Sequence, residues 1–188
     1  MTCELIDVLD EHGKKTGEAK TIVELHSSGV YHQSVHVWLV NAKGEILVQK
    51  RSALSFIYAG YWDISVAGHA SSGHSALETA QKETEEEVGL VLPPEAFCHI
   101  LSFRGGVELL EGAFKDNEFV DVYVVESDAK IEDFVFTDGE VSAVRWLDRD
   151  TFVAWSEGKG EPMTPRFPEE TRALFSYIDK RKHASRLA

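Results

Sequence analysis

The sequence predicts a single α/β domain, and three observations lead to this fold class. Its 188 residues are 43% apolar and 27% charged, a composition that suits one sizeable globular core. Several segments alternate apolar and polar residues with the period of a β-strand, and two other segments carry helix signals. No repeat, low-complexity tract or linker interrupts the chain, so we expect residues 1–188 to form one domain.

Strand and turn patterns fill the first part of the chain. Residues 4–10 alternate and are followed by turn glycines within 11–17, which predicts an N-terminal hairpin. Residues 33–41 alternate as well, and a glycine-containing turn joins them to an apolar run at 45–51. These two segments predict a second, central hairpin, and a short strand is expected at 62–66.

The second part of the chain combines strands with a terminal helix. Prolines at 93–94 predict a turn into a strand, and residues 105–118 read as a loop. Alternation then predicts strands at 119–127 and 141–148. Apolar residues at helical spacing, with a proline at the start, predict a helix over 168–184.

A further helix is predicted over residues 76–88, because both of its ends are marked. Ser75 and Glu78 have the spacing of a capping box at the N-terminus. Gly89 stands where glycine is favoured, just beyond the C-terminus.

Three carboxylates share one stripe of this helix, those of Glu83, Glu86 and Glu87. An acidic stripe is ordinarily a solvated face. Here, however, Glu83 repels both other glutamates at i,i+3 and i,i+4 spacing, at a cost of about 0.2–0.5 kcal/mol per pair. The helix macrodipole also disfavours anions near this end. Because hard cations prefer carboxylate oxygens and reverse these penalties, the stripe indicates a site for Mg²⁺ or Mn²⁺.

Residues 68–90 resemble the signature of the Nudix hydrolases: Gly, five residues, Glu, seven residues, then Arg-Glu-apolar-x-Glu-Glu-x-Gly-apolar. Six positions match it in register: Gly68, Glu83, Glu86, Glu87, Gly89 and Leu90. The resemblance implies a mixed β-sheet sandwiched between α-helices, with 68–90 forming a loop-helix-loop. It also implies that the glutamates hold the metal ions that activate water against a diphosphate.

Three positions depart from the signature. His74 replaces its first glutamate, Lys82 its arginine and Thr84 its aliphatic residue. Lys82 keeps a cation that could orient the glutamates but lacks the bidentate fork of arginine. His74 removes a carboxylate, which leaves a diphosphate-binding module with little or no turnover as one alternative function.

Most of the chain resembles the isopentenyl-diphosphate-isomerase-like branch of this superfamily, which makes isomerisation a competing function. In the isomerases a cysteine that transfers a proton precedes the Gly-His of the motif, whereas Ala67 stands there in this chain.

The resemblance also implies a second metal site with His32 and His69 as ligands, and Glu118 matches a third ligand position. Asp116 stands near a fourth position and His26 lies one place off the expected spacing. Taken singly, a histidine beside a strand is more often a hydrogen-bonded structural residue, but several imidazoles together with carboxylates suit zinc or manganese.

Three further side chains are candidates for catalysis or substrate binding. Glu118 is also a candidate general base. Lys50 and Arg51 are candidates for binding substrate phosphate, although a solvated strand end explains them as well. Specificity is expected to lie in the loops at 52–62 and 104–117, where no recognisable code appears.

Charge and composition limit the partners and the compartment. The formal net charge of −13 argues against binding nucleic-acid phosphate. Two cysteines, Cys3 and Cys98, are too few for a disulfide framework, and no apolar run is long enough to cross a membrane. We therefore expect a cytoplasmic monomer or homodimer that acts on a small molecule. The preferred function is metal-dependent hydrolysis of a phosphoanhydride in a nucleoside di- or triphosphate or another diphosphate-linked metabolite.

Overall fold

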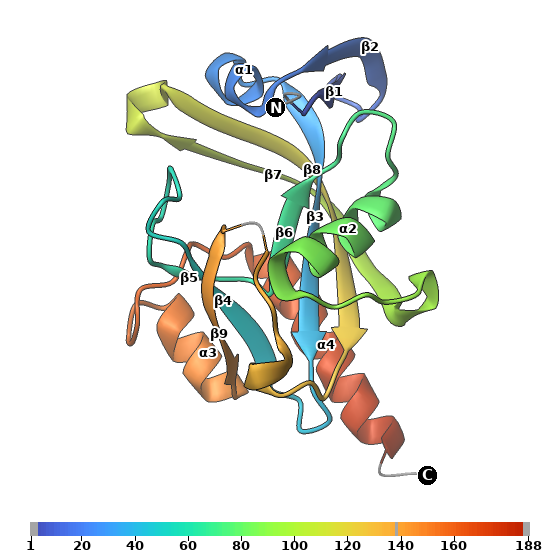
Figure 1. Cartoon of the computed structure of the whole chain (residues 1–188), viewed down its shortest axis with the longest axis vertical. Helices are drawn as coiled ribbons and strands as arrows, with labels where there is room; N and C mark the ends of the chain where they lie inside the picture. Colours follow the sequence, from blue (N-terminus) through green and yellow to red (C-terminus); the bar gives the residue numbers. More distant parts are fainter. Residues whose placement is uncertain (1–3, 138, 186–188) are drawn as a thin grey trace.

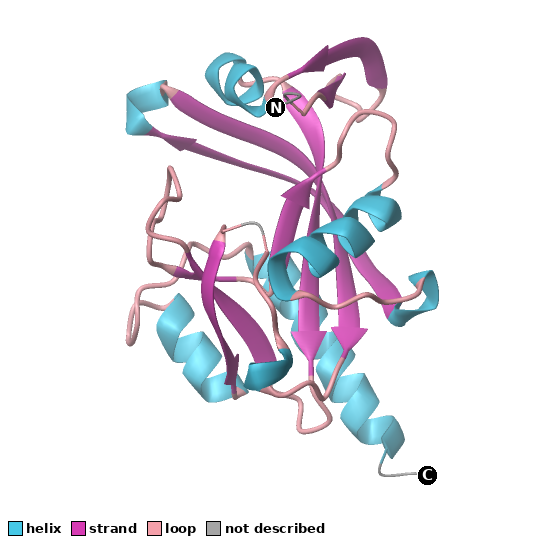
Figure 2. Cartoon of the chain, in the orientation of Figure 1, coloured by secondary structure: helices cyan, strands magenta, loops and turns pink. Residues whose placement is uncertain are grey.

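The protein is a mixed sheet with helices on both faces, as Figures 1 and 2 show for the computed structural model. The structure describes residues 4–137 and 139–185. The strands are β1 (Ile6–Leu9), β2 (Lys15–Lys20), β3 (Tyr31–Val40), β4 (Ile46–Arg51), β5 (Trp62–Asp63), β6 (Val66–His69), β7 (Phe97–Leu109), β8 (Phe114–Glu126) and β9 (Val141–Leu147). The helices are α1 (Ile22–Ser28), α2 (Ala76–Val88), α3 (Arg149–Ser156) and α4 (Pro168–Ser185). The α/β sandwich expected from the sequence is confirmed.

Strand β3 is the centre of the sheet. Along its whole length it pairs in parallel with β8, which in turn pairs with β7 in a long antiparallel arm. Its other edge pairs in succession with β1, β6 and β4. Strands β4, β5 and β9 form the far side of the sheet. The middle of β3 therefore lies beside β6 on one edge and β8 on the other.

The two faces of β3 belong to two separate apolar clusters. Val35, Val37 and Leu39 pack under α2, in a cluster that includes Ala80 and Val88 of that helix. Side chains of the opposite face pack under α3 and α4, in a cluster that includes Trp38. Because successive strand residues face opposite sides, the alternation in β3 assigns each residue to one helix layer.

Four features of the fold differ from the sequence expectations. Residues 105–118, expected as a loop, form the ends of β7 and β8 around a short 3₁₀ turn at Leu110–Gly112. Helices α1 and α3 were not expected. The predicted hairpin of β3 and β4 shares only the pair Val40–Ile46, because the strands diverge and β4 pairs with β5 and β9 instead.

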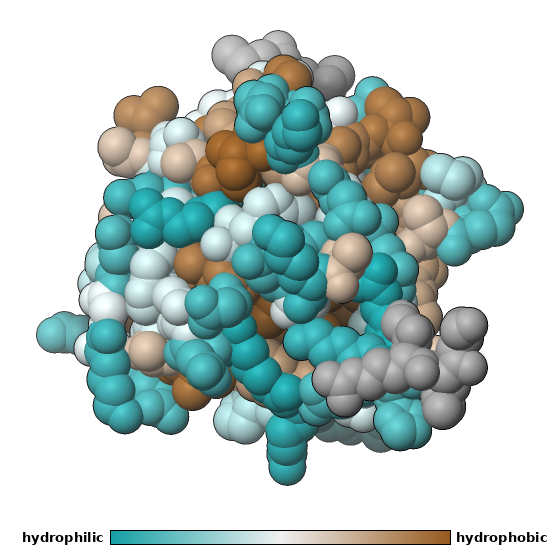
Figure 3. All heavy atoms as spheres, turned by 90° about the horizontal axis from the view of Figure 1, so that it is seen from below, coloured by the Kyte–Doolittle hydropathy of each residue, from teal (hydrophilic) through white to brown (hydrophobic). Residues whose placement is uncertain are grey.

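One face of the molecule is mainly hydrophilic. Hydrophilic side chains predominate on the face seen in Figure 3, with hydrophobic residues in scattered patches. Within residues 4–137 and 139–185, none of the helices combines the length and the apolar character needed to cross a membrane.

Candidate active site and metal centre

Helix α2 holds the acidic stripe in a fixed place. The Ser75 side chain accepts from the Glu78 N–H, and the Glu78 carboxylate accepts from the Ser75 N–H, which completes the predicted capping box. Gly89 ends the helix in the left-handed conformation, at φ 77°. These local contacts give the helix the bounds predicted from its sequence.

Gly68 lies directly against one carboxylate of the stripe. A Cβ atom at this position would come 2.3 Å from Cγ and Cδ of Glu83, closer than any packed contact permits. Only glycine therefore allows Glu83 to lie against β6. Burial, reinforced by the negative charges of Glu86 and Glu4, raises the pKa of Glu83 to about 7, although Lys82 opposes the shift.

Lys82 lies among the carboxylates. Its Nζ atom is 2.7 Å from the Glu86 carboxylate, 3.3 Å from that of Glu83 and 3.9 Å from that of Glu4. Burial alone would lower the pKa of Lys82, but Glu86 and Glu83 raise it well above its usual value. Lys82 therefore remains a cation and offsets part of the repulsion within the stripe.

Glu87 is the most deeply held carboxylate of the three. It is 4% exposed, and its Oε2 atom accepts from Gln49 Nε2 at 2.9 Å and from the Ala67 N–H at 3.1 Å. These contacts join α2 to β4 and β6. They fix the orientation of Glu87 beside the backbone that leads into Gly68.

A second group of side chains converges on the other side of β6. His26 comes from α1, His32 from β3, His69 from β6 and Asp116 from β8, and one ligand atom of each lies within 4.8 Å of the others. The Nε2 atoms of His26 and His32 are both 3.3 Å from Asp116 Oδ1. The site thus gathers residues from four elements that are far apart in the sequence.

The polar atoms of this cluster are buried without hydrogen bonds. Among the described residues, Nε2 of each of the three histidines and Oδ1 of Asp116 have no hydrogen-bond partner. Buried polar atoms are normally satisfied, so four orphans facing one point need a missing partner. Three imidazoles with a carboxylate match the ligands of a transition metal, and the site fits such an ion.

Charge states within the cluster also suit a cation. Burial, together with the neighbouring positive charge of His32, lowers the pKa of His69 to about 3, which keeps this imidazole neutral and able to bind metal. Burial alone would raise the pKa of Asp116, but His26 and His32 hold it well below its usual range. Asp116 is therefore an anion at neutral pH.

Glu118 lies at the edge of the histidine cluster. Its Oε1 atom is 3.7 Å from His69 Nε2 and 4.0 Å from His32 Nε2. Burial and the charge of Asp116 raise the pKa of Glu118. A carboxylate with a raised pKa is a better proton acceptor than an ordinary surface glutamate, so its environment is compatible with either role expected of it.

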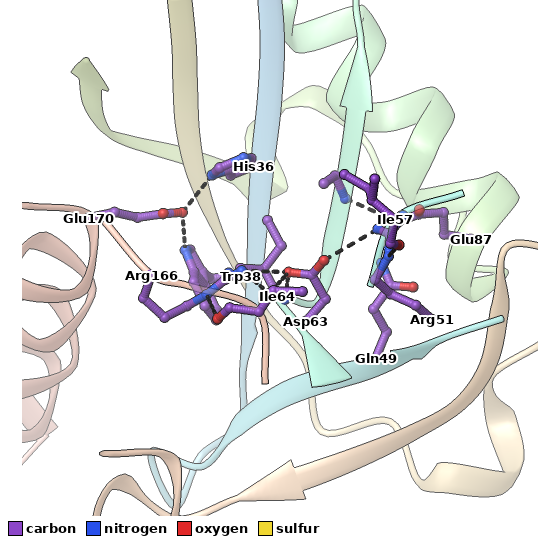
Figure 4. Close-up of polar contacts among 12 residues, drawn as sticks. His36, Trp38, Gln49, Arg51, Ile57, Asp63, Ile64, Glu87, Arg166 and Glu170 are labelled. Atoms are coloured by element: carbon purple, nitrogen blue, oxygen red, sulfur yellow. Dashed lines mark hydrogen bonds and ion pairs between the residues drawn. The ribbon is translucent and has the colours of Figure 1, made fainter. Parts of the chain in front are cut away.

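The two candidate phosphate-binding residues lie on different sides of β4. Arg51 Nη1 is 3.3 Å from Asp63 Oδ2, and the same carboxylate binds Arg166 Nη2 at 2.7 Å (Figure 4). Lys50 instead lies over the ring of Trp62, with its Nζ atom 5.5 Å from the ring centroid. The structure thus brings Arg51, but not Lys50, into the charged network that continues to Arg166.

The remaining sequence candidates fall outside these two groups. His74 is exposed on the loop before α2, where its backbone N–H donates to the Ser71 carbonyl at 2.9 Å. Thr84 is buried in α2 and donates its hydroxyl to the Ala80 carbonyl. Cys98 is a free, exposed thiol, and Cys3 lies outside the described residues.

Helix α2 carries its carboxylates on one side of β6, and the orphaned ligand atoms gather on the other side, an arrangement compatible with metal binding. The model of the NUDIX domain matches residues 30–167, which is most of the chain. The chain therefore belongs to the Nudix family.

Named relatives agree with this assignment. The chain is 41% identical over 155 residues to Nudix hydrolase 3 of Arabidopsis thaliana, a match that covers 81% of this chain but 20% of that protein. It thus spans about a fifth of the length of this relative. It is also 26% identical over 149 residues to an isopentenyl-diphosphate Δ-isomerase of Escherichia coli, which covers 79% of each chain.

A solved structure from Deinococcus radiodurans shares the fold. It covers 92% of this chain and 99% of its own, with a TM-score of 0.71 and 21% sequence identity. At this level of identity the likeness concerns the fold alone.

Proposed function

We propose that this protein is a metal-dependent Nudix pyrophosphohydrolase that cleaves a phosphoanhydride. Its substrate would be a nucleoside di- or triphosphate or another diphosphate-linked small metabolite. The observation that carries the proposal is the carboxylate set of α2, in which Glu83 lies against Gly68 and Glu87 is bound to Ala67. The family assignment and the relative named as a hydrolase support it.

The carboxylates of Glu83, Glu86 and Glu87 would hold Mg²⁺ or Mn²⁺. When bound there, such an ion neutralises charge on the diphosphate and makes water a better nucleophile. Gln49 and the Ala67 amide orient Glu87, and Lys82 orients Glu86.

The chain's own groups would carry the rest of the reaction. Arg51 binds a phosphate oxygen, because a guanidinium matches phosphate geometry and Asp63 holds it in place. Glu118 would accept the proton of the attacking water, because burial and the charge of Asp116 raise its pKa and make it a stronger base than an exposed glutamate.

The histidine cluster would hold a second metal, for which manganese or zinc suits the ligands better than magnesium. His26, His32, His69 and Asp116 would bind it, with Glu118 next to them. An ion there supplies positive charge next to the proposed proton acceptor.

We further propose that the partner of this protein is a small molecule. The net charge of −13 supports a small-molecule substrate over nucleic acid, because polynucleotide binding depends on clustered cations. A cytoplasmic location and a monomeric or homodimeric state are predicted on the sequence evidence alone.

The test is a screen of nucleoside polyphosphates and other diphosphates for phosphate or pyrophosphate release with Mg²⁺ or Mn²⁺. Activity on the substrate found should vanish with chelator and fall about 100-fold in Glu86→Gln. Glu85→Gln is the matched control, because Glu85 is exposed on the same helix. Tight diphosphate binding without turnover would instead favour the binding module that the His74 departure suggests.

A further inference from the structure

Phe56 is the one exposed phenylalanine of this chain. All ten phenylalanines lie in the part of the chain that the structure describes, and the other nine are buried or half-buried. Phe56 is 80% exposed, on the loop that joins β4 to β5. Because an aromatic ring is strongly stabilised by burial, a ring left in water beside a polar site marks a surface that a ligand can cover.

The β4–β5 loop holds Phe56 in a defined place. On one side, Arg51 Nε donates to the carbonyl of Ile57, the residue directly after Phe56, at 3.3 Å. On the other side, the Ser55 N–H donates to the Ser52 carbonyl at 3.2 Å. The same contact keeps Arg51, the candidate phosphate ligand, next to the backbone that carries the ring. A side chain presented from a fixed loop binds a ligand at a lower cost in entropy.

The ring of Phe56 also lies near the histidine cluster. Its centroid is 6.2 Å from that of Phe114, which in turn is 4.3 Å from that of His26. The Phe56 and His26 rings therefore cannot be farther apart than these two distances combined. Figure 1 shows the β4–β5 loop rising toward the β7–β8 arm, which carries Phe114. Since Nε2 of His26 is one of the orphaned atoms, an open apolar ring lies close to the proposed second metal.

A ligand that reaches these features has to carry two different groups. A metal in the histidine cluster and the guanidinium of Arg51 would both bind an anionic group such as a phosphate. The open face of Phe56 suits a flat ring, because a flat ring covers that face without being enclosed and offset stacking adds to apolar burial. A nucleotide meets both requirements, since its base and its phosphates lie at opposite ends of one sugar.

We propose that Phe56 is a specificity-determining residue that stacks on the base of a nucleoside polyphosphate, with the phosphates toward Arg51 and the histidine cluster. This inference rests on the proposed function and narrows it, because it selects nucleotides over diphosphates that carry no aromatic group. The alternative is a structural role, in which Phe56 only packs on Phe114 and holds its loop in place.

The first test compares two ligands that are not hydrolysed at their P–C–P bridge, adenosine 5′-(α,β-methylene)diphosphate and methylenediphosphonate, by calorimetry with Mg²⁺. Phe56→Ala should weaken binding of the adenosine compound about 5- to 100-fold, the range of base stacking on an aromatic side chain, and leave methylenediphosphonate binding unchanged. Phe56→Tyr keeps a ring and should bind both ligands like the wild type. Leu54→Ala is the matched control and should change neither affinity, because Leu54 is 91% exposed on the same loop.

The outcomes separate stacking from the structural role and from the proposed function. An equal loss for both ligands in Phe56→Ala would show that the residue only holds its loop, which overturns the inference. Unchanged binding of the adenosine compound would overturn the inference alone, whereas no binding of either ligand by the wild type would overturn the proposed function with it. Tighter wild-type binding of isopentyl methylenediphosphonate than of the adenosine compound would overturn the preference for a flat ring.

The second test observes the contact directly. With the adenosine compound and Mg²⁺ at saturation, NMR should show nuclear Overhauser effects between the base protons and the ring protons of Phe56. Phe56→Ala should remove these signals, and it should fold like the wild type because the side chain is exposed. Overhauser effects from the base to other side chains, and none to Phe56, would overturn the proposal.

Discussion

Gly68 and Glu83 depend on each other. A methyl group on Gly68 would overlap the Glu83 side chain, because the Cβ position is 2.3 Å from two of its carbons. Gly68→Ala should therefore displace Glu83, destabilise the protein by about 1–3 kcal/mol and weaken Mg²⁺ binding. Denaturant unfolding and metal titration would measure both effects.

A double-mutant cycle provides the control for Gly68→Ala. If the overlap with Glu83 is the cause, Gly68→Ala added to Glu83→Ala should cost far less than Gly68→Ala in the wild type. Additive losses would instead show that the backbone of β6, and not Glu83, requires the glycine.

The raised pKa of Glu83 predicts how the metal-free protein responds to pH. An unfolded glutamate ionises near 4.5, whereas the folded pKa is about 7, so the folded state binds this proton more tightly. Glu83 therefore favours folding below pH 4.5, and this contribution is lost as pH rises from 4.5 through 7. Glu83→Gln should remove this component of the pH dependence and stabilise the metal-free protein at pH 8, as urea unfolding with chelator would show. An identical pH dependence in the two proteins would contradict the shift.

At the scale of the element, α2 is less strained than a stripe of three acids suggests. Lys82 approaches both Glu86 and Glu83, so it offsets part of their repulsion before any metal binds. Lys82→Gln should lower the stability of the metal-free protein by less than about 1 kcal/mol, since the pair is partly exposed. It should also enlarge the stabilisation that saturating Mg²⁺ provides. Thermal unfolding with and without Mg²⁺ measures the difference, and a smaller metal response in Lys82→Gln would refute this account.

Elements with local signals could be predicted, and elements that depend on distant contacts could not. Helix α2 has both caps in its own sequence, so its predicted bounds agree with the structure. Helix α1 carries a capping box as well, from Thr21 and Glu24, but its seven residues are too few to show a clear apolar period. The sequence predicts a loop at 105–118, the tip of the β7–β8 arm, because Gly105 and Gly106 interrupt the strand pattern there.

The same distinction applies to the site. The carboxylates of α2 share one helix face, so helical spacing alone predicts that they lie together. The histidine cluster needs β3, β6 and β8 in register, with His32 paired to Glu118 and His69 paired to Ser34. The family resemblance predicts His32 and His69 as ligands. His26 also belongs to the cluster, because α1 places it beside these two histidines.

At the scale of the whole molecule, a metal in the histidine cluster would tie the N-terminal helix to the sheet. At a free Mn²⁺ concentration near 100 times Kd, binding to the folded state adds about 2.7 kcal/mol, which raises Tm by about 5–10 °C in a chain of this size. His26→Gln should lose most of this shift, while His99→Gln retains it. Thermal unfolding of metal-stripped protein with added Mn²⁺ is the measurement. A full shift in His26→Gln would exclude His26 as a ligand.

The last prediction is that this protein does not isomerise isopentenyl diphosphate, although one relative is named as that isomerase. Allylic isomerisation needs one group to protonate a double bond and another to remove a proton across the substrate. Ala67 carries no transferable proton at the position before Gly68. Glu118 on β8 and His36 on β3 are ionisable groups. Their side chains project from neighbouring strands on the same face of one sheet, so both would approach a bound substrate from one side.

Allylic isomerisation also passes through a carbocation, which an aromatic face would have to shield. The segment before α4 offers Phe167, whose ring packs on Phe103 with a centroid distance of 4.9 Å. Isopentenyl diphosphate should therefore take up no deuterium from heavy water and form no dimethylallyl diphosphate with Mg²⁺ or Mn²⁺, as NMR would detect. Ala67→Cys, which restores a thiol beside His36, tests whether that single group limits the reaction. Isomerisation by the wild-type protein at an ordinary enzymatic rate would overturn the hydrolase assignment, because it would show that the chain assembles proton transfer on both faces without a group at position 67.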